Sequence, residues 1–186
     1  MLTLEDKKLL NRIRCGNQEA LQQIYEKYRD DLFTILVSLT RDVHTSEDCL
    51  QEIFVNFAGN ADNFKIRRNL KKYLISCVIN LARDCLRKKT TQLDCFLEDL
   101  SSLATINDPV QDLINKEESI QLFQALSKLP YEQRETFVLH IQGEMKFREI
   151  ANLQKVSIKT VQSRYRYGVE KLQKLLVKET IDEVCK

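Results

Sequence analysis

The chain has 186 residues, of which 43% are hydrophobic and 30% charged, so it can bury one ordinary core or two small ones. Its formal charge of +2 is an average over blocks of opposite sign along the chain. The N-terminus lacks the basic start of an export signal and no apolar run approaches the ~18 residues that span a bilayer, so we expect a soluble cytoplasmic protein without membrane contacts.

The composition also argues against metal binding and catalysis. None of the six cysteines forms a CxxC pair, and His44 and His140 are the only histidines. We therefore expect neither a zinc site nor another cofactor, and interpret most cysteines as small buried hydrophobic residues. The sequence contains no GxGxxG, P-loop, HExxH or Ser/His/Asp arrangement, so it does not predict an enzyme.

The spacing of apolar residues predicts an all-α protein. Only 4 Gly and 2 Pro interrupt the chain, and apolar residues recur every three to four positions rather than alternating. The first half is expected to contain helices over Leu4–Arg14, over Gln18–Leu39, from a capping box at Thr45 and Asp48 to Gly59, and over about Leu70–Arg87. Together they form the expected first domain, residues 1–90.

A polar segment separates this domain from a second one. Residues 91–110 lose clean periodicity and contain the turn signal Asn107-Asp108-Pro109, so we expect an acidic linker. The alternative, a short helix docked on a core, would use the segment's large apolar residues, Phe96, Leu97, Leu100 and Leu103. The expected second domain, residues 111–186, follows with predicted helices over Val110–Leu129, Pro130–Gln142, Lys146–Leu153 and Ile158–Val177.

Charge alternates in blocks along these segments. Residues 1–64 carry seven basic and eleven acidic side chains, and residues 65–91 carry nine basic and one acidic. Residues 94–118 carry one basic and seven acidic side chains, and residues 144–174 carry eight basic and three acidic. Two separated basic surfaces suggest two contacts with one polyanion, whereas the acidic segment between them should avoid nucleic acid.

Residues 147–164 have the pattern of a helix-turn-helix. Ile150 and Val161 are expected to pack the two helices together, and Ser157 can cap the second helix. Polar donors near the start of that helix would meet bases and phosphates in a major groove. These candidates are Lys159, Thr160, Gln162, Ser163, Arg164 and Arg166. The alternative is a solvated basic face on an ordinary bundle helix.

The basic stretch that ends the first domain interleaves cations with an aromatic residue and an amide. Cations neutralise phosphates, and an aromatic ring can stack on a base that has left the duplex. The stretch is therefore a candidate site for single-stranded DNA, formed by Arg68, Lys72, Tyr73, Asn80, Arg83, Arg87 and Lys88. A core tyrosine beside a solvated charged face would explain the same pattern.

The helix expected after Thr45 combines acidic residues with an apolar ridge. Its polar candidates are Glu47, Asp48, Gln51 and Glu52, beside Leu50, Ile53 and Phe54. An acidic rim next to apolar side chains suits a protein partner. Acidic residues that complement the helix dipole explain the same charges nearly as well.

Taken in this order, the patterns resemble the extracytoplasmic function (ECF) sigma factors of the sigma-70 family over nearly the whole chain. In the first domain the matching residues are Asp48-Cys49-Leu50-Gln51-Glu52-Ile53-Phe54, Tyr73-Leu74, Asn80, Asp84 and Leu86-Arg87. In the second domain they are Leu129-Pro130, Arg134, Phe137, Leu139, Glu149-Ile150-Ala151, Thr160-Val161, Ser163-Arg164 and Leu172. Each motif alone is weak, but their order and spacing together are specific.

The resemblance implies a sigma factor that binds core RNA polymerase and directs transcription initiation at specific promoters. In the family, the first domain (region 2) binds the polymerase clamp and melts the minus-ten element. The expected polymerase contacts are Asp48, Gln51, Glu52 and Phe54. The second domain (region 4) reads the minus-thirty-five element, and the linker follows the polymerase's cationic channel. Core polymerase and promoter DNA are the expected partners, and an anti-sigma factor is left open.

Three residues depart from the family pattern. Tyr73 stands where Trp is usual, and Ile79 stands where a basic residue often precedes Asn80. Lys155 occupies the usual Gly of the helix-turn-helix turn, so it must accept a less favourable backbone conformation or alter the turn. The rival function is a helix-turn-helix regulator that binds duplex DNA without polymerase and without melting it.

Overall fold

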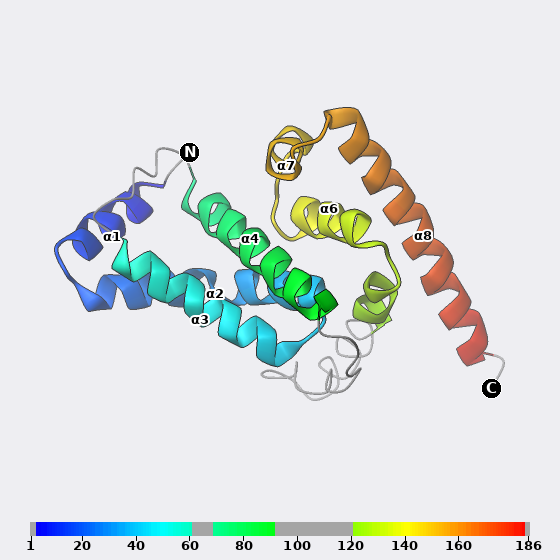
Figure 1. Ribbon diagram of the computed structural model, residues 1–186, viewed down its shortest axis with the longest axis horizontal. Coiled ribbons are helices and arrows are strands. Elements are labelled where there is room, and N and C mark those ends of the chain that lie inside the picture. Colours follow the sequence, from blue (N-terminus) through cyan, green and yellow to red (C-terminus); the bar gives the residue numbers. More distant parts are fainter. Residues whose placement is uncertain (1–2, 61–68, 92–120, 185–186) are drawn as a thin grey trace. The chain divides into compact units, whose positions relative to one another are not determined.

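The computed structural model describes residues 3–60, 69–91 and 121–184, and among them the side chains of 3–60, 69–88 and 121–177. Arg68 and the predicted linker beyond residue 91 lie outside the described residues. Every regular element within the described ranges is a helix, which confirms the predicted all-α class. The chain divides into two compact units, Met1–Asp94 and Cys95–Lys186, drawn in Figure 1.

The first unit packs four helices around α2. These are α1 (Leu4–Arg14), α2 (Gln18–Thr40), α3 (Val43–Gly59) and α4 (Leu70–Thr91). α2 contacts each of the other three, and α3 also lies along α4 (Figure 1). The starts of α1 and α2 are fixed by N-caps. Thr3 Oγ1 accepts from the Asp6 N–H at 3.0 Å, and Asn17 Oδ1 accepts from the Ala20 N–H at 2.8 Å.

The core of the first unit follows the predicted apolar stripes. Ile24, Leu32 and Ile35 of α2 are fully buried, as are Leu74 and Ile79 of α4. Burying each such side chain contributes roughly 1.5–3 kcal/mol. Because the apolar stripes of α3 and α4 face α2, their polar side chains are left on the outside of the unit.

The predicted start of α3 is wrong. The helix begins at Val43, and its N-cap is Asp42, whose Oδ1 accepts from the Thr45 N–H at 3.2 Å. The Thr45 hydroxyl donates to Asp42 Oδ2 at 2.6 Å, so Thr45 lies inside the first turn instead of capping it. Asp42 was overlooked because the Thr45–Asp48 spacing also fits a capping box, in which Thr45 would accept from the Asp48 N–H, whereas in the structure Asp42 caps the helix by accepting from the Thr45 N–H.

The second unit contains a helical segment over 121–127, α6 (Tyr131–Ile141), α7 (Phe147–Gln154) and α8 (Ile158–Val184). α8 packs on both α6 and α7 (Figure 1). A cluster of Ala125, Leu126, Leu129 and Leu172 closes one part of the core, and Val138, Leu139, Ile150 and Val161 fill the other. α8 continues beyond the predicted end at Val177, and α4 continues beyond Arg87.

Candidate nucleic-acid and protein interfaces

The turn between α7 and α8 has the geometry of a helix-turn-helix. Lys155 ends α7 in the left-handed conformation, at φ 55° and ψ 43°, and the Val156 N–H donates to the Ala151 carbonyl at 3.0 Å. The expectation that a non-glycine residue accepts an unfavourable backbone here is confirmed. Ser157 Oγ accepts from the Thr160 N–H at 3.1 Å, so the predicted cap of the second helix is also present.

Packing between the two helices determines which side chains remain accessible. Ile150 and Val161 are fully buried, as predicted. The opposite face of α8 exposes side chains at helical i, i+3, i+4 and i+7 spacing, namely Lys159, Gln162, Ser163 and Arg166. Thr160 and Arg164 lie half-buried beside this face. All six candidates are therefore grouped on the first turns of α8.

Three contacts involve the arginines of this face. Arg166 Nε lies 3.9 Å from Glu170 Oε1, and its guanidinium stacks 4.9 Å from the Tyr167 ring centroid. Both partners of the ion pair are exposed, so it contributes little to stability and can open for another anion. Arg164 Nη1 donates to Gln154 Oε1 at 2.8 Å and is tied to α7.

The basic candidates on α4 are grouped along one side of that helix. Tyr73, Asn80 and Arg87 recur at seven-residue intervals, which places them along one face, and Arg83 lies beside them. Asn80, Arg87 and Lys88 are exposed, whereas Lys72, Tyr73 and Arg83 are half-buried. Arg87 also pairs with Asp84 at 3.0 Å, with both side chains largely exposed. Arg68, the remaining candidate, precedes the described part of this helix.

A cavity of about 250 Å³ lies beside Tyr73. Its lining comes from α3 and α4, together with the residue that follows α3, and consists of Ile53, Asn56, Phe57, Asn60, Tyr73, Leu74 and Cys77. Burial, and then the neighbouring Cys77, raises the pKa of Tyr73 to about 12, so its hydroxyl stays protonated at neutral pH. Sites for drug-sized ligands begin at about 300 Å³, so this cavity is smaller than such sites.

The outer face of α3 carries the acidic candidates and an unpredicted valine. Asp48, Gln51 and Glu52 are exposed, and Val55 continues the same helical face with 69% of its surface exposed. Its spacing of three residues from Glu52 and four from Gln51 is the signal in the sequence that points to Val55, but Phe54, three residues after Gln51, shares that spacing. An exposed apolar residue among acids is what a docking face for a protein requires.

Phe54 lies on the other side of α3. Its side chain is only 7% exposed, and its ring meets Tyr25 edge-to-face with centroids 4.9 Å apart. It also approaches Phe57 at 6.5 Å. In the free chain Phe54 is therefore a core residue that supports the acidic face, while Val55 occupies the accessible position.

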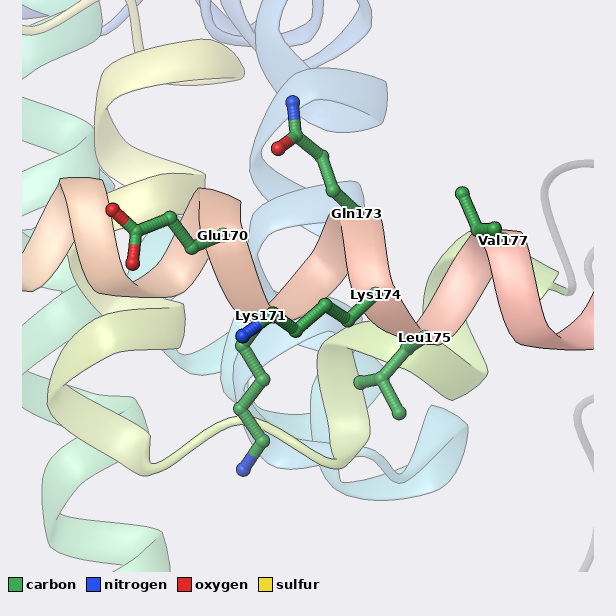
Figure 2. A pocket seen from close by; sticks show the side chains of 6 residues that line it. All are labelled: Glu170, Lys171, Gln173, Lys174, Leu175 and Val177. Atoms are coloured by element: carbon green, nitrogen blue, oxygen red, sulfur yellow. The ribbon is translucent and has the colours of Figure 1, made fainter.

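No three His, Cys, Asp or Glu side chains within the described ranges come close enough to hold a metal ion. In the same ranges, no helix has the length and apolar character to cross a bilayer. Figure 2 shows a hollow along the C-terminal half of α8, lined by side chains of that helix, Glu170, Lys171, Gln173, Lys174, Leu175 and Val177.

Comparison with known proteins connects the two units to one family. Residues 24–92 match Sigma-70 region 2, and residues 119–172 match Sigma-70, region 4. The ECF RNA polymerase sigma factor SigW of Bacillus subtilis is 28% identical over 179 residues, which cover 91% of this chain and 96% of SigW. The matched regions include α3, α4 and the helix-turn-helix.

Solved structures show the same fold. CnrH, in complex with the cytosolic domain of CnrY, superposes with a TM-score of 0.67 at 23% identity, over 94% of this chain and 98% of CnrH. The sigma factor RpoE of Bartonella quintana, in complex with the anti-sigma factor NepR, superposes with a TM-score of 0.64 at 20% identity, over 83% of this chain and 95% of RpoE.

Proposed function

This chain belongs to the sigma-70 family, in its ECF branch, and we propose that it binds core RNA polymerase and directs initiation at specific promoters. The observation that carries the proposal is that both sigma-70 regions are present in order, each with an accessible polar helix face. We assign residues 1–90 to region 2, 91–110 to the linker and 111–186 to region 4. Its partners are core polymerase and promoter DNA.

The outer face of α3 is the proposed polymerase contact. Asp48, Gln51 and Glu52 offer acceptors and charge, and Val55 offers apolar surface that a partner can desolvate. Phe54 contributes by holding α3 against α2 instead of touching the partner. The acidic face would meet a basic surface on the polymerase.

The exposed side of α4 is the proposed site for the separated non-template strand of the minus-ten element. Its candidates are Arg68, Lys72, Tyr73, Asn80, Arg83, Arg87 and Lys88. The cations neutralise phosphates, and the half-buried Tyr73 ring provides a surface on which a base can stack. The cavity beside Tyr73, whose mainly apolar lining includes Asn56 and Asn60, is the proposed pocket for one flipped base, and capturing that base would offset the few kcal/mol of unstacking.

The helix-turn-helix is the proposed reader of the minus-thirty-five duplex. The first turns of α8 present Lys159, Gln162, Ser163 and Arg166, with Thr160 and Arg164 beside them. These side chains combine donors for phosphates with donors and acceptors for base edges. The capped start of α8 adds backbone N–H groups that favour phosphate.

The remaining expectations follow from this role. Sigma factors select promoters while the polymerase performs the chemistry, so we propose no catalytic site and no cofactor for this chain. Its place of action would be the cytoplasm, where the polymerase works. The acidic linker would follow the polymerase's cationic channel. An anti-sigma factor, like the NepR found in complex with RpoE, would be a further partner.

Transcription with purified components tests the proposal. The full chain is added to sigma-free core polymerase and a template that carries the upstream region of its own operon, with permanganate probing of unpaired thymines. We expect a transcript and melted minus-ten thymines only when the chain and the core are both present. No transcript, from a core that an established sigma factor activates, contradicts the proposal. Sequence-specific binding by the free chain without melting would support the rival regulator.

A further inference from the structure

A chain of hydrogen bonds joins α6, α7 and α8 at Gln154. Its side-chain oxygen accepts from Arg164 Nη1 of α8 at 2.8 Å. Its amide nitrogen donates to Glu135 Oε2 at 3.2 Å and to Thr136 Oγ1 at 3.0 Å, both on α6. Gln154 is the last residue of α7, so one side chain connects α6 and α7 to the polar start of α8.

The polarity of these bonds determines the orientation of the amide. The guanidinium of Arg164 only donates, so the carbonyl of Gln154 must face the arginine, and its NH₂ group must face Glu135 and Thr136. Thr136 fits the same orientation, because its hydroxyl donates to the Glu132 carbonyl at 2.7 Å and thereby turns a lone pair toward Gln154. The reversed amide would place its NH₂ group against the guanidinium, so that two donors would meet.

Burial makes one end of this chain rigid. Glu135 is 2% exposed and Thr136 is fully buried in α6, whereas Gln154 and Arg164 are half-buried. The anchored carboxylate therefore holds the amide, and the amide holds a guanidinium at the edge of the DNA-facing side. Arginine has five N–H donors, so the bond to Gln154 leaves four for DNA.

We propose that Gln154 is a positioning residue for promoter recognition, which holds Arg164 in the orientation that meets the minus-thirty-five duplex. This inference rests on the proposed function. A long arginine side chain loses rotamer freedom when it binds, and a preset orientation removes part of that loss. A fixed guanidinium can also match one pattern of base-edge acceptors, whereas a mobile one finds phosphates of any sequence. The bond therefore adds to specific binding more than to non-specific binding.

Gln154→Ala tests the proposal because it breaks the bond without changing charge. The variant is measured in the full chain bound to core polymerase. We expect about three- to tenfold weaker initial binding to the cognate promoter, in line with one ordered side chain. Binding to an unrelated duplex and the rate of promoter melting stay unchanged, since the cations and the first unit are intact. Gln173→Ala, the same change on an exposed part of α8 (Figure 2), serves as control.

A reciprocal exchange separates positioning from mere packing. Gln154→Glu alone places a carboxylate against Glu135 and should weaken promoter binding further. In combination with Glu135→Gln, the new carboxylate at position 154 accepts from Arg164, and the new amide at position 135 donates to that carboxylate. Promoter binding should therefore recover to within about threefold of the wild type. Recovery of the double variant is informative even if Gln154→Ala unfolds, and thermal melts monitor folding throughout.

The outcomes are distinct. Weaker cognate binding by Gln154→Ala, with recovery in the exchanged pair, supports the proposal. Wild-type affinity of Gln154→Ala, or an equal loss on cognate and unrelated duplexes, overturns it. If the wild-type holoenzyme itself yields no transcript, the proposed function has failed and the positioning role with it.

Discussion

The Sγ atom of Cys49 lies 3.3 Å from the Sγ atom of Cys85, and this contact joins α3 to α4. α3 carries the proposed polymerase face and α4 the proposed single-strand face, so the two thiols meet between the two helices on which the function depends. Burial, then the hydrogen bond with Cys85 and the negative charge of the Cys85 thiolate, raise the pKa of Cys49 to about 12. The acidic Glu52 and Asp48 act in the same direction.

The first prediction concerns the reactivity of these thiols. In the folded chain at pH 7.5, Cys49 should react with iodoacetamide about a thousandfold more slowly than a free cysteine of pKa ~8.5, because its thiolate is scarce and its side chain is buried. Cys15 is exposed and should react before Cys49. Peptide mass spectrometry over time gives both rates. Equal rates for Cys15 and Cys49 in the folded chain, with urea as the unfolded control, would contradict the structure.

The second prediction concerns acid stability at the start of the first unit. Asp6 is 2% exposed, and its carboxylate accepts from Lys27 Nζ at 2.9 Å and from the Tyr28 hydroxyl at 3.0 and 3.1 Å. Burial opposes its ionisation, but hydrogen bonds from Lys27, Thr3 and Tyr28 outweigh it and lower the pKa of Asp6 below 3.8. Its contribution to stability is therefore complete above pH 3.8 and is lost as pH falls through the lower folded-state pKa.

Asp6→Asn should reduce the free energy of unfolding at pH 7 by about 1–3 kcal/mol, since it weakens hydrogen bonds to a buried charge. The difference from the wild type should shrink below pH 3.8, where Asp6 of the wild type also becomes protonated. Urea unfolding at several pH values between 2 and 7 measures it. Asp30→Asn, which alters an exposed acid on α2, should have little effect. A difference that does not vary with pH would be evidence against an ionised Asp6.

The helices could be predicted from the sequence because the spacing of apolar residues indicates which side of a helix is buried. The stripes that begin at Leu4, Gln18, Leu70 and Ile158 each start a helix at that residue. The cap at Ser157 could also be predicted from the sequence, since a cap is a contact between residues three apart. The start of α3 was misplaced, because Asp42 and Thr45 compete for the same local role.

The parts that could not be predicted depend on contacts between distant positions. Gln154 meets Glu135, 19 residues away, and Arg164, 10 residues away, and no local pattern marks it as a junction. Phe54 looked available to a partner because helical spacing alone does not say which apolar residue faces α2. Tyr25, which covers it, is the information that the sequence lacked.

The third prediction concerns Val55. Val55→Ala should bind core polymerase about five- to tenfold more weakly, because removing two methyl groups from a contact that becomes buried forfeits about 1–1.5 kcal/mol. Stability of the free chain should change little, since the side chain is 69% exposed. Competition with a labelled sigma factor for core polymerase measures the affinity. Val177→Ala, at a valine 59% exposed on α8, is the matched control, and an equal effect of both would refute a specific role for Val55.

The last prediction concerns Lys155, the residue that closes the helix-turn-helix in the left-handed conformation at φ 55°. This conformation strains a side chain with a Cβ atom by roughly 1 kcal/mol, asparagine tolerates it better, and a β-branched residue tolerates it worst. Lys155→Gly should stabilise the second unit by about 0.5 kcal/mol, since relief of strain exceeds the entropy that glycine adds to the unfolded chain. Lys155→Val should destabilise it by about 1 kcal/mol or more.

Comparing Lys155→Asn with Lys155→Val separates the effect of charge on stability from the effect of backbone strain, because both variants remove the same cation. Denaturation without DNA, followed by circular dichroism and resolved into the transitions of the two units, should rank the variants in stability as Gly, Asn, Lys and Val. A valine variant as stable as the asparagine variant would mean that the turn relaxes out of the left-handed region. In that case α8 would enter the duplex at a different angle, and the promoter preference of the valine variant should change together with its turn.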